Sequence, residues 1–210
     1  MSRSYGQYCG LARALDAVGD RWNLLIVRQL LIAPARYREL LDGLGGVATN
    51  LLADRLRDLE AAGVVERRLA EEPNAIVYAL TPWGAELREP VEGLIRWSTP
   101  LMARGPADDR FHAEWLVVGL AALFAGRTAS RASTVGIAVD GQLLQLRATR
   151  SGVEVTLHAG GALDAVVRAD APIVLGLAAA AFTLDDVGGL VDIEGDETAA
   201  RALFDCRRSH

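Results

Sequence analysis

Residues 49–61, TNLLADRLRDLEA, carry hydrogen-bonding side chains at helical spacing. Leucines recur there at i, i+4 and i+7, which predicts a short helix with one apolar face that packs on a core. These leucines are Leu52, Leu56 and Leu59. The opposite face carries Asn50, Ala53, Asp54 and Arg57. Amide, carboxylate and guanidinium groups on one exposed face predict the recognition of a polar partner.

Residue types that support catalysis or metal binding are scattered along the chain. Cys9 and Cys206 lie near opposite ends of the 210 residues, which predicts two reduced thiols rather than a disulfide framework. The three histidines form no H-x-x-x-H or Cys/His cluster, and the second half contains no nucleophile elbow and no paired acid and base in one motif. We therefore expect no metal, no cofactor and no enzymatic activity.

The elements before the polar stripe are predicted to be helices. The segment LARALDAVGDRWNLLIVRQLL has apolar residues at helical spacing on both sides of Gly19 and Asp20, and Asp20 is placed to cap the second of two helices. A further short helix is expected in ARYRELLDGL, ended by a Gly-Gly pair. Thr49 is then expected to cap the helix with the polar stripe, which stops at Gly63.

After Gly63 the apolar period changes from that of a helix to that of a strand. The segments VVERRLA and AIVYALT flank the polar turn EEPN, which predicts a β-hairpin. A long helix follows from Pro82, and Pro90 within it predicts a kink or a break. The order of helices, helix-turn-helix, hairpin and helix predicts a winged helix-turn-helix domain.

A winged helix-turn-helix domain offers its polar stripe to the major groove of DNA, which is wide enough to admit one α-helix. Arg67 and Arg68 lie on the predicted hairpin, where a wing contacts backbone phosphates. The stripe alone has an ordinary alternative, since any short amphipathic helix shows such a face to water. The hairpin directly after it favours the DNA interpretation.

Residues 9 to about 100 resemble the HxlR-type regulators, a branch of winged-helix transcription factors close to the MarR group. The resemblance rests on CGLARALDAVGDRWNLLIVRQLL, APARYRELLDGLGGVATNLLADRLRDLEAAGVVERR and VYALTPWGAEL, in this order. It implies a homodimer, paired through the N-terminal segment and the long helix after the wing, that binds a palindromic operator in double-stranded DNA. It also implies repression more often than activation.

By position, the resemblance puts Arg36 at the start of the first helix of the motif. It places seven further residues on the reading helix and the wing: Thr49, Asn50, Ala53, Asp54, Arg57, Arg67 and Arg68. The residue types fit these places, because asparagine can read adenine, aspartate can accept from cytosine, and arginine can hold phosphate or guanine. Arg55 lies nearer the leucines, so we expect it to be a structural ion-pair partner.

The reading helix is less basic than the family pattern. Residues 49–61 hold two arginines against Asp54, Asp58 and Glu60. Because phosphate neutralisation supplies most nonspecific binding, we expect this attraction to be weak and binding to need the dimer.

Cys9 lies where many members of this family keep a cysteine, and in some of them the resemblance implies sensing of electrophiles or oxidants. A reactive thiolate needs a lowered pKa, and the nearby charge is modest, with Arg13 one turn on. The alternative is an inert, half-buried cysteine at a dimer interface.

The second half of the chain is of another class. Gly105 and Pro106 in ARGPADD predict a boundary between two domains, residues 1–104 and 105–210. The second domain is predicted to be α+β, with a meander of antiparallel strands covered by helices on one face. Its segments ALDAVVRAD, APIVLGLAAAAF and GGLVDIEGDETAARALF resemble the sterol-carrier-protein-2 type of lipid-binding domain.

That second resemblance implies an apolar tunnel between the sheet and the helices. It places a ligand site near Trp115, Leu177 and Phe182, where Gly176 and the alanines of residues 178–181 would leave room. The same small residues equally serve close packing between helices.

We expect a homodimeric, sequence-specific DNA-binding regulator, acting as a repressor, whose second domain binds a small apolar effector. The alternatives are a carrier of apolar ligands or a dimerisation module fused to a DNA-binding domain. The longest apolar run, residues 171–182, is too short to cross a bilayer, and the N-terminus lacks the pattern of a secretory signal. These features predict no membrane association and a cytoplasmic location.

Overall fold

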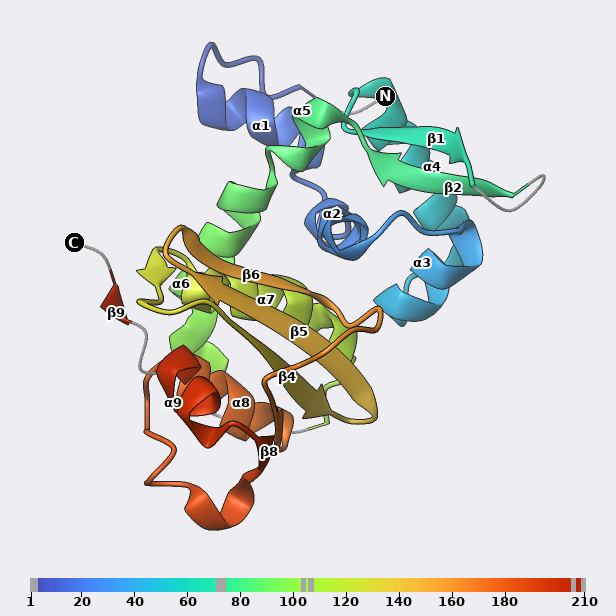
Figure 1. The fold of residues 1–210 in the computed structure, drawn as a ribbon. Helices are drawn as coiled ribbons and strands as arrows, with labels where there is room; N and C mark the ends of the chain where they lie inside the picture. Colours follow the sequence, from blue (N-terminus) through green and yellow to red (C-terminus); the bar gives the residue numbers. More distant parts are fainter. Residues whose placement is uncertain (1–3, 71–74, 103–104, 106–107, 205–206, 209–210) are drawn as a thin grey trace. The chain divides into compact units, whose positions relative to one another are not determined.

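The computed structural model describes residues 4–70, 75–102, 105, 108–204 and 207–208 (Figure 1). It contains two compact units, Met1–Val91 and Glu92–His210, and buried apolar side chains form a core in each. The boundary predicted between residues 104 and 105 falls beside a position outside the described residues and remains a prediction. No helix in the described part of the chain is long and apolar enough to span a bilayer.

The first unit begins with four helices, α1 (Gly10–Val18), α2 (Asn23–Ile32), α3 (Tyr37–Leu44) and α4 (Thr49–Ala61). The prediction that Asp20 caps the second helix is wrong, because Trp22 is the N-cap residue of α2; the Asp20 carboxylate accepts a hydrogen bond from the Trp22 N–H at 3.2 Å, just before the helix begins. The prediction that Thr49 caps α4 is wrong. Ala48 is the N-cap residue, because the chain leaves the extended conformation there and Thr49 is already helical.

Strands β1 (Val65–Leu69) and β2 (Ile76–Leu80) form the predicted antiparallel hairpin. Val65 pairs with Leu80 at its base and Leu69 pairs with Ile76 at its outer end. The turn predicted in EEPN lies outside the described residues. Ala35 exchanges two backbone hydrogen bonds with Tyr78, of 3.0 and 2.8 Å, and so ties the start of the helix-turn-helix to the wing.

The long helix predicted from Pro82 is divided into α5 (Pro82–Ala85) and α6 (Arg88–Met102). The Thr81 hydroxyl caps α5 by accepting from the Gly84 N–H at 2.9 Å. A break was predicted at Pro90, but it falls before Arg88. Pro90 lies in the first turn of α6, where a backbone N–H has no partner within the helix to lose.

The core of the first unit forms around the leucine face of α4. Leu52, Leu56 and Leu59 are at most 1% exposed, and Leu40 of α3 and Ile26 of α2 are fully buried with them. This burial is the main source of stability for α4, since a helix of 13 residues is marginal in isolation.

The second unit contains a sheet with helices on one side. Its strands are β4 (Ser133–Val139), β5 (Gln142–Thr149), β6 (Gly152–Leu157), β7 (Ala165–Arg168) and β8 (Asp192–Gly195), in the spatial order β6-β5-β4-β7-β8. A separate short pair joins β3 (Arg127–Thr128) to β9 (Arg207–Arg208). The helical elements are η1 (Ala113–Trp115), α7 (Leu116–Phe124), α8 (Ala171–Ala178), η2 (Gly188–Leu190) and α9 (Glu197–Phe204).

The sheet is mixed, so the prediction of an antiparallel sheet is wrong at one pair. Strand β4 pairs with β7 in parallel, with Val135 opposite Ala165 and Ile137 opposite Val167. The cause is topological: β5 already occupies one edge of β4, so the chain crosses after β6 to the free edge and enters it in the same direction. Helix α7 packs against β6, and α9 packs against β4 and β7.

Helix α7 is buried almost all round, with Leu116, Val117, Val118, Leu120 and Phe124 at most 4% exposed. Helix α7 is therefore an interior helix. The Asp196 carboxylate caps α9 by accepting from the Thr198 N–H at 2.9 Å.

Candidate nucleic-acid interface

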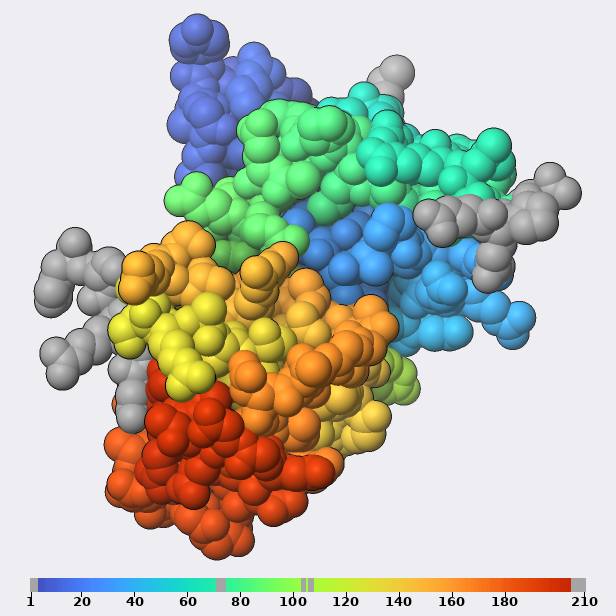
Figure 2. Space-filling model, in the orientation of Figure 1, coloured from blue at the N-terminus to red at the C-terminus, as the bar shows by residue number. Residues whose placement is uncertain are grey.

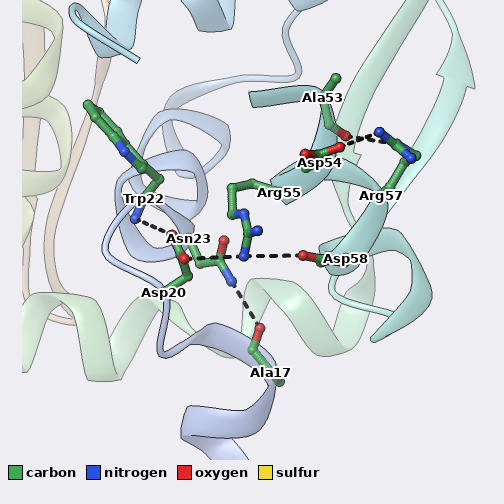
Figure 3. Close-up of polar contacts among 9 residues, drawn as sticks. All are labelled: Ala17, Asp20, Trp22, Asn23, Ala53, Asp54, Arg55, Arg57 and Asp58. Atoms are coloured by element: carbon green, nitrogen blue, oxygen red, sulfur yellow. Dashed lines mark hydrogen bonds and ion pairs between the residues drawn. The ribbon is translucent and has the colours of Figure 1, made fainter. Parts of the chain in front are cut away.

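Helix α4 separates an apolar face from a polar one. Thr49, Asn50, Asp54 and Arg57 are exposed and Ala53 is half-buried, while the leucines on the other side are in the core. The side chains predicted for base reading therefore share one accessible face. Figure 3 shows three of them, Ala53, Asp54 and Arg57, along one edge of the helix.

Helix α3 is joined to α4 by a turn and by a hydrogen bond. Gly45 and Gly46 adopt positive φ angles of 52° and 88°, which glycine tolerates and other residues rarely adopt. The Tyr37 hydroxyl donates to the Thr49 carbonyl oxygen at 2.5 Å and holds the first turn of α4. The sequence pattern did not identify Tyr37, because a backbone carbonyl as its partner leaves no signal in side-chain types.

Arg36 lies at the N-cap of α3, as the resemblance implied. Its backbone N–H donates to the Glu39 carboxylate at 2.6 Å. Its side chain is exposed at the N-terminal end of this helix, where an anion is favoured by the helix dipole.

A cluster of polar side chains links α4 to the corner between α1 and α2 (Figure 3). The Arg55 guanidinium lies 3.2 Å from the carboxylates of both Asp20 and Asp58. The prediction that Arg55 is an ion-pair partner is confirmed. Beside it, Asn23 is only 3% exposed and donates through Nδ2 to the Ala17 carbonyl oxygen at 3.1 Å. No feature of the sequence pattern marks Asn23 as part of this cluster.

The two charged residues on the exposed face of α4 pair with each other. The Arg57 guanidinium forms an ion pair with the Asp54 carboxylate one turn before it, and its Nε–H donates to the Ala53 carbonyl oxygen at 3.4 Å (Figure 3). Both side chains remain at least half exposed, at 69% for Arg57 and 50% for Asp54. Their charges cancel on the face that was predicted to meet DNA.

The wing arginines are paired as well, and in different ways. Arg67 makes a forked contact with the Glu60 carboxylate of α4, with distances of 2.6 Å from Nε and 2.8 Å from Nη2. Its guanidinium also lies 5.9 Å from the centre of the Tyr78 ring. The nearby Glu60 carboxylate raises the pKa of Arg67. Arg67 thus links strand β1 of the wing to helix α4.

Arg68 pairs with the Glu66 carboxylate within strand β1. Because paired residues share a face of a hairpin, Arg67 lies on the face of Tyr78 and Arg68 on the opposite face with Val77. If the hairpin enters a groove of DNA, its two faces meet the phosphate backbones on the two sides of that groove, so both arginines could reach a phosphate. Both strands lie at the surface of the molecule (Figure 2).

Cys9 lies at the exposed N-cap of α1. The backbone N–H groups of Ala12 and Leu11, in the first turn of α1, lower the pKa of its thiol. Cys206 lies outside the described residues. Among the described residues, no group of three His, Cys, Asp or Glu side chains is placed to hold a metal ion.

The residues predicted to form an apolar ligand site are packed in the second unit. Leu177 is 1% exposed, and the Phe182 ring lies over Gly176 so closely that a Cβ there would be 2.1 Å from Cζ. Phe182 therefore fills the room that Gly176 leaves. Trp115 is half-buried, with its ring centre 4.7 Å from that of His112.

Two open hollows of the second unit are lined by other residues. The larger, of about 510 Å³, lies beside Asp140, Arg168, Asp170 and Ile173. The smaller, of about 330 Å³, lies beside Arg147, Ser151 and Glu154. Both are lined by charged groups.

The comparisons with known proteins concern the part of the chain that contains the helix-turn-helix and the wing. Residues 17–105 match the family model described as HxlR-like helix-turn-helix. The HTH-type transcriptional regulator YodB of Bacillus subtilis is 34% identical over 86 residues, which are 40% of this chain and 77% of YodB. The uncharacterized HTH-type transcriptional regulator YvaP of the same organism is 36% identical over 88 residues, 41% of this chain and 82% of YvaP.

A solved structure of the reduced form of YodB from B. subtilis is 29% identical and covers 47% of this chain and 99% of that one, with a TM-score of 0.41. The sequence relatives carry the assignment, since each exceeds 30% identity over more than two thirds of its own length. Through these residues, the chain belongs to the HxlR-like helix-turn-helix family.

Proposed function

We propose that the protein is a cytoplasmic regulator of transcription that binds a palindromic operator as a homodimer and represses. The observation that carries this proposal is the exposed polar face of α4, followed directly by a surface hairpin with two exposed arginines. This arrangement lies within the part of the chain shared with YodB and YvaP, whose names describe HTH-type transcriptional regulators.

In the proposed complex α4 enters the major groove. Asn50 is suited to the N6 and N7 edge of adenine, and Asp54 to the amino group of cytosine. Arg57 is suited to guanine or a phosphate once it leaves Asp54. Thr49 and Ala53 offer a hydroxyl and a methyl group to neighbouring bases. Arg36, Arg67 and Arg68 would hold backbone phosphates and set the register of the protein on the duplex.

The homodimer is supported by exposed apolar stripes on two helices. On α6, Leu94, Trp97 and Leu101 recur at i, i+3 and i+7 and are 48%, 76% and 60% exposed. On α1, Leu11 and Leu15 are 69% and 40% exposed. Stripes of this kind mark interaction surfaces, and a two-fold dimer covers the same patch on both copies. A palindromic operator mirrors that symmetry.

Two finer roles belong to the same proposal. The lowered thiol pKa and the exposure of Cys9 support a role in sensing oxidants or electrophiles. For the second unit we propose binding of a small apolar effector in a site of the sterol-carrier-protein-2 type near Trp115, Leu177 and Phe182. The alternatives are a carrier of apolar ligands and a dimerisation module, both without effector control, and the packing of Phe182 on Gly176 favours the dimerisation module.

Fluorescence anisotropy with two labelled duplexes tests the main proposal. One duplex carries the region upstream of the protein's own gene, and the other carries the same bases in scrambled order. Tighter binding to the first duplex, with two copies of the chain per palindrome, is the expected result. Equal affinity for the two duplexes at every salt concentration would contradict sequence-specific regulation.

A further inference from the structure

The polar cluster around Arg55 is placed to control the orientation of α4. Leu52, Leu56 and Leu59 hold the helix through apolar contacts, which have no preferred direction and permit small rolls and shifts. Arg55 contributes a directional contact, because its guanidinium lies 3.2 Å from the Asp20 carboxylate, 35 positions earlier in the chain.

Asp20 is itself fixed in place. Its carboxylate also accepts from the Trp22 N–H at 3.2 Å, and its carbonyl oxygen accepts from the Asn23 N–H at 3.0 Å. Asn23 in turn donates to Ala17 in the last turn of α1. Figure 3 shows this chain of contacts running from Ala17 to Asp58. These contacts therefore fix the position of α4 relative to the corner between α1 and α2.

A small roll of α4 is enough to disturb base reading. The side chains of a helix reach about 5–6 Å from its axis, so a roll of about 20° moves their ends by about 2 Å. Hydrogen bonds to base edges are lost over such a distance, because they weaken outside a window of about 0.5 Å. Phosphate contacts by long, flexible arginines tolerate it far better.

We propose that Arg55 and Asp20 are positioning residues for base recognition: their ion pair fixes the roll of α4, so that Asn50, Asp54 and Arg57 meet the bases in register. This inference rests on the proposed function. Arg55 itself is placed away from DNA, because its side chain is 24% exposed while that of Arg57 is 69% exposed. Sequence preference then depends on a contact that touches no base.

Asp58 supplies a matched control. It makes an ion pair of the same length with the same guanidinium, but from within α4, three residues further on. Removing its charge therefore leaves the link between α4 and the α1–α2 corner in place. Asp20→Asn cuts that link and changes no residue of α4, and the remaining amide oxygen still accepts from the Trp22 N–H.

The experiment compares Asp20→Asn, Arg55→Met, the double variant and Asp58→Asn on the operator and scrambled duplexes, between 50 and 200 mM salt, with the thermal midpoint of each. Asp20→Asn and Arg55→Met are expected to lower operator affinity about tenfold and leave scrambled-DNA affinity and the salt slope unchanged. The double variant should lose no more than Arg55→Met alone, and Asp58→Asn should keep the wild-type ratio of affinities.

Three results would overturn the inference. A salt slope reduced by about 0.9 per chain in Arg55→Met would show that Arg55 contacts a phosphate. Equal losses on both duplexes, in step with the thermal midpoint, would show a purely structural role. If Asp58→Asn and Asp20→Asn lowered the preference for the operator equally, the negative charge around Arg55 would matter and not the contact that joins α4 to the α1–α2 corner. If wild-type protein shows no preference between the duplexes, the proposed function fails instead.

Discussion

Replacement of Glu66 by glutamine is expected to tighten binding to DNA of any sequence. In the free protein Glu66 pairs with Arg68 on the wing, at 41% and 51% side-chain exposure. To hold a phosphate, Arg68 must leave this carboxylate. The glutamine variant removes the competition and adds one unit of positive charge to the surface near the DNA.

The size of the effect follows from the exposure of the pair. Ion pairs between exposed side chains contribute about 0–1 kcal/mol, so relief of the competition is worth up to about fivefold in affinity per wing. In the proposed complex the Glu66 carboxylate would also repel the phosphates, but at about 10 Å in water this repulsion is about 0.4 kcal/mol before screening and less after it. We expect a gain of about two- to fivefold per wing.

The salt dependence gives a second measure of the same change. Each phosphate neutralised contributes about −0.9 to the slope of log affinity against log salt. Glu66→Gln should therefore steepen the slope by up to about 0.9 per engaged wing. Fluorescence anisotropy on scrambled and operator duplexes, between 50 and 200 mM salt, measures the gain and the slope together. Both duplexes should gain equally, since a phosphate contact carries no sequence information.

Glu194→Gln is the matched control for total charge. Glu194 lies 2.9 Å from Arg168 in the second unit and is also exposed, so its replacement makes the same change in net charge on a residue outside the first unit. If Glu194→Gln tightens binding as much as Glu66→Gln, or if Glu66→Gln binds no tighter than wild type, the competition between Glu66 and phosphate is refuted.

Four further outcomes are expected. Leu56→Ala should destabilise the first unit by about 2–5 kcal/mol in urea titrations, because its side chain is 1% exposed; a loss below about 1 kcal/mol would contradict its place in the core. Gly176→Ala should cost about 1–3 kcal/mol through collision with Phe182, and adding Phe182→Leu should recover part of the thermal midpoint. Iodoacetamide should alkylate Cys9 with a pH midpoint below that of a cysteine peptide, a difference that unfolding should abolish. Trp97→Glu should convert the dimer to monomer in light scattering at micromolar concentration, and an unchanged mass would exclude the α6 stripe from the interface.

The spacing of apolar residues along the sequence was sufficient to predict the helix-turn-helix and the wing. Leu52, Leu56 and Leu59 repeat at helical spacing and are all buried, and the alternation after Gly63 coincides with β1. Periodicity succeeds here because each element buries one face against a single core. It gave no means of placing the start of α4 to the residue, since Ala48 and Thr49 are both compatible with the N-cap.

Contacts between distant residues were not predictable from spacing. Nothing in the sequence pattern joins Tyr37 to the Thr49 carbonyl, or Arg67 to Glu60. The parallel pairing of β4 and β7 has the same origin, because it depends on which edge of the sheet remains free when the chain returns. Spacing also left open whether Gly176 makes room for a ligand or permits close packing, and the residue that packs on it, Phe182, stands six positions later.

We expect affinity and sequence preference to depend on separate groups of charged residues in the first unit. The pair of Glu66 with Arg68 is expected to set how much positive charge the wing offers, so a change there should move affinity and salt slope for every duplex. The pair of Asp20 with Arg55 joins α4 to the corner between α1 and α2, and a change there should move the ratio between operator and scrambled DNA without moving the slope. Since the two groups share no residue, Asp20→Asn and Glu66→Gln combined should show both effects added together, with the preference of the first and the slope of the second. Interdependence of the two effects would mean that the wing and the roll of α4 are coupled, and the contact available to couple them is the fork between Arg67 and Glu60.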